Sequence, residues 1–181
     1  MRKIPITLVV LLILFNCLYS CADKTYNSET DIYRKVDSIM SLMTLNEKIG
    51  QTIMYSGDWN KTGPYVTSDN MKLLKEGNLG SMLNVYTSKG TKELQKIAVE
   101  ETRLGIPLLF GYDVIHGFKT IFPINLGIAS SWDLSDVEEV ARISAEEASA
   151  SGVHWTFAPM IDIARDPRWG RISEGSGEDV Y

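Results

Sequence analysis

Two stretches of the chain carry side chains whose types and spacing could do chemistry. The first is Gly111-Tyr-Asp-Val-Ile-His-Gly117, which follows the apolar run Ile106–Phe110. An acid directly after such a run is costly to bury unless it meets a partner or a ligand. A carboxylate such as Asp113 can accept hydrogen bonds from two adjacent hydroxyls, which is what sugar recognition needs. A structural cap or ion pair is the alternative for Asp113, and for His116 we favour a structural hydrogen bond over catalysis.

The second stretch runs from Ala158 to Asp179 and mixes charges with turn residues. Five acidic and three basic side chains lie between Asp162 and Asp179, together with Trp169 and several glycines. Such density in a loop favours ion pairing, and the planar fork of arginine suits both carboxylates and vicinal sugar hydroxyls. Trp169 could stack on a sugar, although its position alone favours an anchor for the loop.

Several other classes of function fit the sequence poorly. The 181 residues hold 18 basic and 23 acidic side chains, and this net charge of −5 disfavours nucleic acid as a partner. We find no phosphate-binding loop, no nucleophile elbow and no complete dinucleotide fingerprint. The two cysteines and the two histidines, His116 and His154, lack metal-ligand spacing. We therefore expect no metal and no organic cofactor.

The apolar pattern predicts an α/β fold that positions both stretches. Continuous apolar runs without alternation are typical of strands in a parallel sheet, which is buried on both faces. Thr44 and Glu47, and likewise Ser135 and Glu138, have the spacing of helix capping boxes. We expect helices over 31–43, 44–52, 71–75, 91–103 and 135–152, strands over 80–86, 106–110 and 153–157, and a loop over 58–68.

The first twenty residues have the form of a secretory signal. A basic start, Met1-Arg-Lys3, precedes an apolar segment that is short of the ~20 residues a membrane-spanning anchor needs. Leu18-Tyr-Ser-Cys21 resembles a bacterial lipobox, although Tyr19 replaces the usual small residue. We expect a lipoprotein-type signal over 1–20, lipid on Cys21 and a polar tether over 21–30. That chain would be held at a membrane in the periplasm or outer membrane, with simple cleavage by an ordinary signal peptidase as the alternative.

Taken together, these motifs resemble the N-terminal domain of glycoside hydrolase family 3, in particular its bacterial secreted or periplasmic β-glucosidases. The resemblance covers residues 31–181. It rests on these segments: Leu45-Asn-Glu-Lys-Ile-Gly-Gln51, Ile106–Gly117, Thr120–Trp132, Trp155-Thr-Phe-Ala-Pro-Met-Ile-Asp162, Arg165-Asp-Pro-Arg-Trp-Gly-Arg171 and Glu174-Gly-Ser-Gly-Glu-Asp179.

The resemblance implies a (β/α)8 barrel of the TIM type that releases β-linked glucose, or a related sugar, from non-reducing ends with retention. Two carboxyl groups do this work, one as nucleophile and one as acid and base. Asp113 and Arg171 match the family's sugar-binding residues. Asp166, Glu174 and His116 are expected to support them without touching the sugar.

The family's nucleophile and acid/base match no position here, so we expect no catalytic residue in this chain. A barrel needs ~250 residues, so we expect an incomplete barrel with open edges and exposed apolar faces. The parent protein is expected to be an exo-acting β-glucosidase acting on β-linked glucosides or oligosaccharides. The alternatives are a sugar-binding surface lipoprotein without activity, or a β-xylosidase or β-N-acetylglucosaminidase of the same family.

Overall fold

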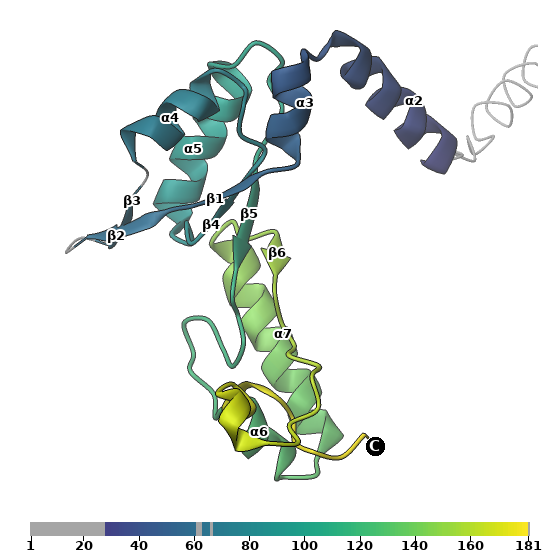
Figure 1. Cartoon of the computed structure of the whole chain (residues 1–181), viewed down its shortest axis with the longest axis vertical. Coiled ribbons are helices and arrows are strands. Elements are labelled where there is room, and N and C mark those ends of the chain that lie inside the picture. Colours follow the sequence, from purple (N-terminus) through teal and green to yellow (C-terminus); the bar gives the residue numbers. More distant parts are fainter. Residues whose placement is uncertain (1–27, 61–62, 66, 181) are drawn as a thin grey trace, which may run out of the picture. The chain divides into compact units, whose positions relative to one another are not determined.

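The computed structural model describes residues 28–60, 63–65 and 67–180. The chain divides into two compact units, Met1–Leu42 and Met43–Tyr181. In the first unit, helix α2 spans Ser28–Leu42 (Figure 1). Helix α2 therefore includes residues 28–30, which we expected to be tether. The expected signal peptide and Cys21 lie outside the described residues.

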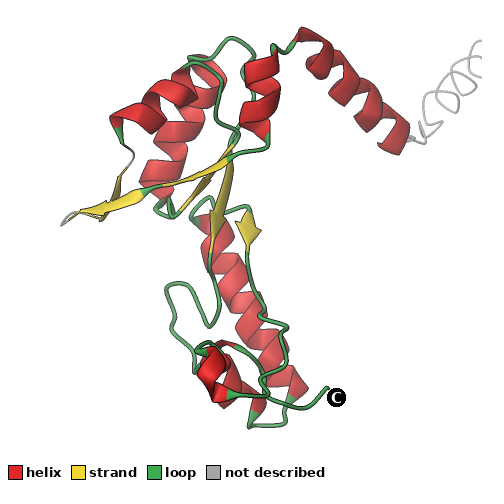
Figure 2. Ribbon diagram, in the orientation of Figure 1, coloured by secondary structure: helices red, strands yellow, loops and turns green. Residues whose placement is uncertain are grey.

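The second unit is built on a parallel sheet of four short strands, drawn among the yellow strands of Figure 2. These are β1 (Met54–Ser56), β4 (Ser81–Leu83), β5 (Leu109–Tyr112) and β6 (Trp155–Thr156). Their order in the sheet, β1-β4-β5-β6, is their order along the chain, and every neighbouring pair is parallel. A sheet wound in one direction is the arrangement of consecutive strands in a (β/α)8 barrel, whereas doubly wound folds reverse direction. This confirms the predicted fold class.

Helices alternate with these strands and begin close to where the sequence predicts. They are α3 (Leu45–Gln51), α4 (Ser68–Lys75), α5 (Ser88–Glu100), α6 (Asn125–Ala129) and α7 (Leu134–Ala150). The predicted capping box of α3 is present, because Glu47 N donates to Thr44 Oγ1 and Thr44 N donates to Glu47 Oε2. The sequence did not predict α6.

Two local predictions were wrong. Residues 58–68 are not a plain loop, because β2 (Asp58–Asn60) pairs antiparallel with β3 (Gly63–Tyr65). A polar, proline-containing stretch gives little sign of such backbone pairing. The capping box predicted for α7 is also wrong: Asp133 caps the helix by accepting from Ser135 N at 2.8 Å, which places Ser135 inside the first turn.

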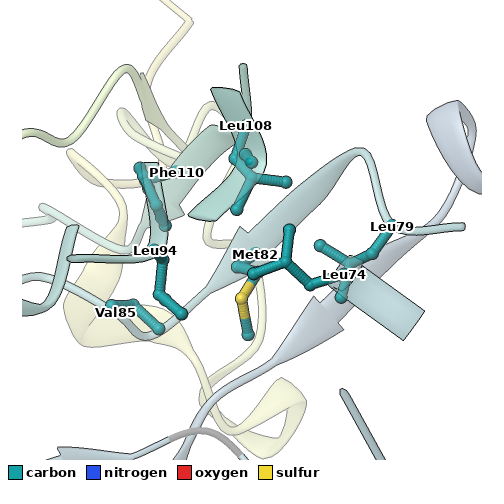
Figure 3. Packing of buried hydrophobic residues seen from close by; sticks show 8 residues of the cluster. Leu74, Leu79, Met82, Val85, Leu94, Leu108 and Phe110 are labelled. Carbon is teal, nitrogen blue, oxygen red and sulfur yellow. The ribbon is translucent and has the colours of Figure 1, made fainter. Parts of the chain in front are cut away.

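One face of the parallel sheet carries the main hydrophobic core (Figure 3). Met82 and Phe110 lie opposite each other in register and pack with Leu74, Leu94 and neighbouring side chains from α4 and α5. A second, smaller cluster joins Val114 and Val153 to Ala148 of α7. Side chains alternate across a strand, so this face includes every second residue of each strand.

The opposite face of the sheet is much more exposed. A β-carbon at Gly111 would lie 3.0 Å from a ring carbon of Phe157 and 3.2 Å from Met54 Cε, so these three residues share that face. Leu109, Trp155 and Phe157 are 51%, 49% and 41% exposed. The exposed apolar face that we expected is therefore present among the described residues.

Candidate functional site

The carboxyl ends of the parallel strands meet at one edge of the sheet, which is where sites form in such folds. The strands end at Ser56, Leu83, Tyr112 and Thr156. The residue that follows β5 is Asp113, and the chain after β6 leads into the charged segment 158–179. The fold thus brings the two stretches singled out in the sequence to the same edge.

Asp113 is exposed, and no described residue donates a hydrogen bond to its carboxylate. The pKa of the neighbouring Tyr112 is raised, first by burial and then by the negative charge of Asp113. An exposed carboxylate with free oxygens at this edge can accept hydrogen bonds from ligand hydroxyls.

Arg171 is held by a two-pronged ion pair with Glu174. Arg171 Nε donates to Glu174 Oε1 at 2.9 Å, and Nη2 donates to Oε2 at 2.7 Å. This pair raises the pKa of Arg171, and the charges of Asp162 and Asp113 raise it further. It lowers the pKa of Glu174. The structure therefore brings Arg171 and Glu174 together, within electrostatic reach of Asp113.

The pair is also fixed to the rest of the domain. Asn125 Nδ2 of α6 donates to the backbone oxygen of Glu174 at 2.7 Å. A guanidinium has five N–H donors, and the ion pair uses two of those on Arg171. No described residue accepts from its remaining donors.

Asp166, which we expected to support the sugar-binding residues, pairs with Arg168. Its carboxylate accepts from the backbone and guanidinium of Arg168, which lowers the pKa of Asp166. This contact caps a short 3-10 helix, η1 (Pro167–Trp169), while η2 spans Ile172–Glu174. Asp166 thus shapes the turn before Arg171 and is not bonded to Arg171. Trp169 is 42% exposed.

His116 makes a structural hydrogen bond within the loop that follows β5. Its Nδ1 lies 3.0 Å from the backbone oxygen of Phe122, and Phe122 N donates to the oxygen of His116. Glu147 of α7 holds the same loop, accepting from Lys119 N, Thr120 N and Thr120 Oγ1 at 2.7 to 2.8 Å. These bonds lower the pKa of Glu147. We did not predict Glu147, because its partners lie 27 or 28 residues earlier.

Asn84, at the end of β4, is a further residue that the sequence analysis missed. Its φ is +64°, a left-handed backbone that is uncommon outside glycine, and its side chain donates to Ser56 on the neighbouring strand β1. A polar residue inside the apolar run Gly80–Tyr86 was the signal that could have drawn attention to it.

A cavity of about 430 Å³ lies between α6, α7 and β6, with Val114 and Asn125 in its lining. Val137, Val140, Ala141 and Ala148 contribute to its largely apolar lining, which includes no Asp, Glu, Lys or Arg. A sugar site needs convergent polar and charged groups, so we place the candidate site at Asp113 and Arg171.

The described part of the chain lacks two further kinds of feature. It holds no cluster of three or more histidine, cysteine, aspartate or glutamate side chains suited to a metal ion. None of its helices combines the length and the hydrophobicity needed to cross a bilayer.

Comparison with known proteins gives a consistent family. Residues 44–181 match the family described as "Glycosyl hydrolase family 3 N terminal domain". A periplasmic beta-glucosidase of Salmonella typhimurium is 44% identical over 147 residues, covering 81% of this chain and 19% of the relative. A putative beta-xylosidase of Formosa agariphila is 31% identical over 200 residues, covering 100% of this chain and 26% of the relative.

A solved structure agrees with these relatives. The beta-glucosidase from Listeria innocua, crystallised with isofagomine, superposes with a TM-score of 0.68 at 41% identity. The match covers 81% of this chain and 20% of that one. The chain thus spans about a fifth of the length of the Salmonella and Listeria proteins.

Proposed function

The chain belongs to glycosyl hydrolase family 3, and on this basis we propose that the gene product containing it is an exo-acting, retaining β-glucosidase. Its substrates are terminal, non-reducing β-D-glucosyl residues of glucosides or oligosaccharides. The observation that carries the proposal is the exposed carboxylate of Asp113, to which no described residue donates, within electrostatic reach of the Arg171–Glu174 pair at the carboxyl edge of a parallel sheet. The similarity to the Salmonella periplasmic beta-glucosidase supports the choice of sugar.

The residues of this chain bind and orient the sugar. Asp113 accepts hydrogen bonds from two neighbouring hydroxyls of the terminal ring, and Arg171 donates to the same ring with the N–H groups that Glu174 leaves free. Glu174 holds the guanidinium in plane, and Asp166 shapes the turn that precedes it. We assign neither the nucleophile nor the acid/base of a retaining mechanism to any residue of this chain.

The proposal is tested with the gene product that contains these 181 residues. It should hydrolyse 4-nitrophenyl β-D-glucoside, and NMR should show the β-anomer of glucose as the first product. Saturable binding of glucose without hydrolysis would favour the alternative of a sugar-binding lipoprotein. If the protein shows no binding and no hydrolysis, both the β-glucosidase proposal and the lipoprotein alternative are contradicted.

A β-xylosidase is the second candidate, because the Formosa putative beta-xylosidase aligns with the whole of this chain. The two sugars differ at carbon 5, where xylose lacks the hydroxymethyl group. The ratio of kcat/KM for the 4-nitrophenyl β-glucoside and β-xyloside decides between them, and we expect the glucoside to be preferred.

We also propose that the protein is exported and held at a membrane by lipid on Cys21. The basic start, the apolar segment and the lipobox-like Leu18–Cys21 support this, as does the periplasmic location in the name of the Salmonella relative. Metabolic labelling with a radioactive fatty acid should mark the wild-type protein and leave Cys21→Ala unlabelled. Equal labelling of both would exclude Cys21 as the anchor.

A further inference from the structure

The left-handed backbone of Asn84 directs the side chain away from the sheet face that an extended strand would place it on. Met82, two residues earlier, packs in the hydrophobic core on the covered face of the sheet. An extended strand would send Asn84 to the same face. At φ +64° the amide instead reaches Ser56, and Asn84 Nδ2 lies 3.0 Å from Ser56 Oγ.

Ser56 belongs to the exposed face. It stands two residues after Met54, whose side chain lies beside Gly111 on that face. Asp113 stands two residues after Gly111, and Asn84 N donates to Gly111 O at 3.2 Å. Asn84, Ser56 and Asp113 therefore border the same end of the same face.

The hydrogen bonds of Ser56 determine which way the Asn84 amide points. Ser56 has one hydroxyl hydrogen, which it donates to Gly57 O at 2.9 Å. Its oxygen must then accept from Asn84, so the NH₂ group faces Ser56 and the amide oxygen faces away. Asn70 Nδ2 donates to Ser56 O, and Gly57 N donates to Leu83 O, so the backbone on which this orientation depends is itself held.

The amide oxygen of Asn84 is thus a fixed acceptor at the rim of the candidate site, and no described residue donates to it. A neutral acceptor in a set orientation suits a hydroxyl donor. Among residues other than glycine, asparagine adopts the left-handed backbone at little cost. This explains why an amide can stand here at the end of an apolar strand.

We infer that Asn84 is a substrate-binding residue, whose Oδ1 accepts a hydrogen bond from a hydroxyl of the sugar that Asp113 holds. The inference rests on the proposed function, to which it adds a third contact from a third strand end. Ser56 acts through Asn84 as a positioning residue.

The test replaces Asn84 by glycine, which accepts φ +64° without strain and removes only the amide. In the gene product that contains this chain, Asn84→Gly should lower kcat/KM for 4-nitrophenyl β-glucoside roughly 3- to 10-fold, the range for one neutral hydrogen bond. The loss should fall mainly on KM, and the melting temperature should fall by no more than a few degrees, because the bond to Ser56 is lost and glycine adds freedom to the unfolded chain. Asn78→Ala is the matched control, because Asn78 lies at the opposite end of β4 and its amide is bonded to Glu76.

Kinetics on a set of monodeoxy glucosides distinguish a binding role of Asn84 from a purely structural one. On the substrate that lacks the contacted hydroxyl, Asn84→Gly should have the same kcat/KM as the wild type. On the other deoxy substrates it should show the full loss of kcat/KM, roughly 3- to 10-fold. Ser56→Ala should show the same pattern with a smaller factor. Wild-type kinetics for Asn84→Gly, or an equal loss on every deoxy substrate, would overturn the inference. Absence of turnover by the wild type would instead overturn the proposed function, and this inference with it.

Discussion

Two carboxylates at opposite edges of the parallel sheet differ in how their oxygens are used. Glu47 lies at the edge where the strands begin and is 6% exposed. It accepts from Thr44 N, Thr44 Oγ1, Arg103 Nε and Arg103 Nη2 at 2.6 to 3.1 Å. Asp113 lies at the edge where the strands end, is exposed and has no hydrogen-bond donor among the described residues.

The difference separates a stabilising carboxylate from a binding one. The bonds from Arg103 and Thr44 lower the pKa of Glu47 from 4.5 to about 2, and its side chain is buried. Asp113 keeps its oxygens free at the edge where (β/α)8 barrels place their sites, whereas the opposite edge serves stability. Whether the carboxylate oxygens already accept hydrogen bonds from the protein thus indicates the role of each acid.

The largest effect should come from removing the Asp113 carboxylate at the binding edge. In the gene product containing this chain, Asp113→Ala should lower kcat/KM on aryl β-glucosides roughly 10²- to 10⁴-fold. The reason is that two hydrogen bonds to a charged acceptor are lost, and these strengthen as the ring flattens in the transition state. Glu100→Gln, at the end of α5, is the control and should leave kcat/KM unchanged. Near-normal kcat/KM in Asp113→Ala would refute the binding role.

A smaller but specific effect should follow from changing one arginine of the second stretch. Arg171→Lys removes the planar fork that pairs with Glu174, so we expect kcat/KM to fall roughly tenfold or more. Arg168→Lys changes a neighbouring arginine in the same segment, whose partner is Asp166. Equal losses in both variants, measured by steady-state kinetics, would mean that the segment tolerates no lysine and that Arg171 has no special role.

The smallest effect should appear in the pH dependence of stability at the Glu47 edge. A carboxylate with a lowered pKa stabilises the fold above its unfolded pKa, and this is lost as the pH falls through its folded pKa. Thermal unfolding should therefore show the advantage of wild type over Glu47→Gln shrinking between pH 4.5 and about 2. A constant difference across that window would mean that the charge of Glu47 does not matter.

Local features were the ones that the sequence could predict. The capping box of Thr44 and Glu47 is readable because its two members are three residues apart and satisfy each other. The same spacing gave a wrong prediction at Ser135. Asp133 is the N-cap instead, because its carboxylate accepts from the amides of the first turn. Apolar runs predicted β4, β5 and β6 and their parallel class but missed β1, and position after a strand pointed to Asp113.

Long-range pairings were beyond the sequence pattern. Arg103 meets Glu47 across 56 residues, and Asn84 meets Ser56 across 28. Neither pair has a spacing that any periodicity would reveal, since the register of neighbouring strands and the helix between them create the contact.

The most direct measurement compares two isosteric variants, Asp113→Asn and Glu47→Gln, for melting temperature and for kcat/KM per folded molecule. Each keeps the shape of the side chain and removes its charge. We predict that Asp113→Asn keeps the wild-type melting temperature and loses most of the activity. Glu47→Gln should lose several degrees of stability and keep its activity. The same loss of both properties in both variants would contradict the division of the sheet into a stabilising edge and a binding edge.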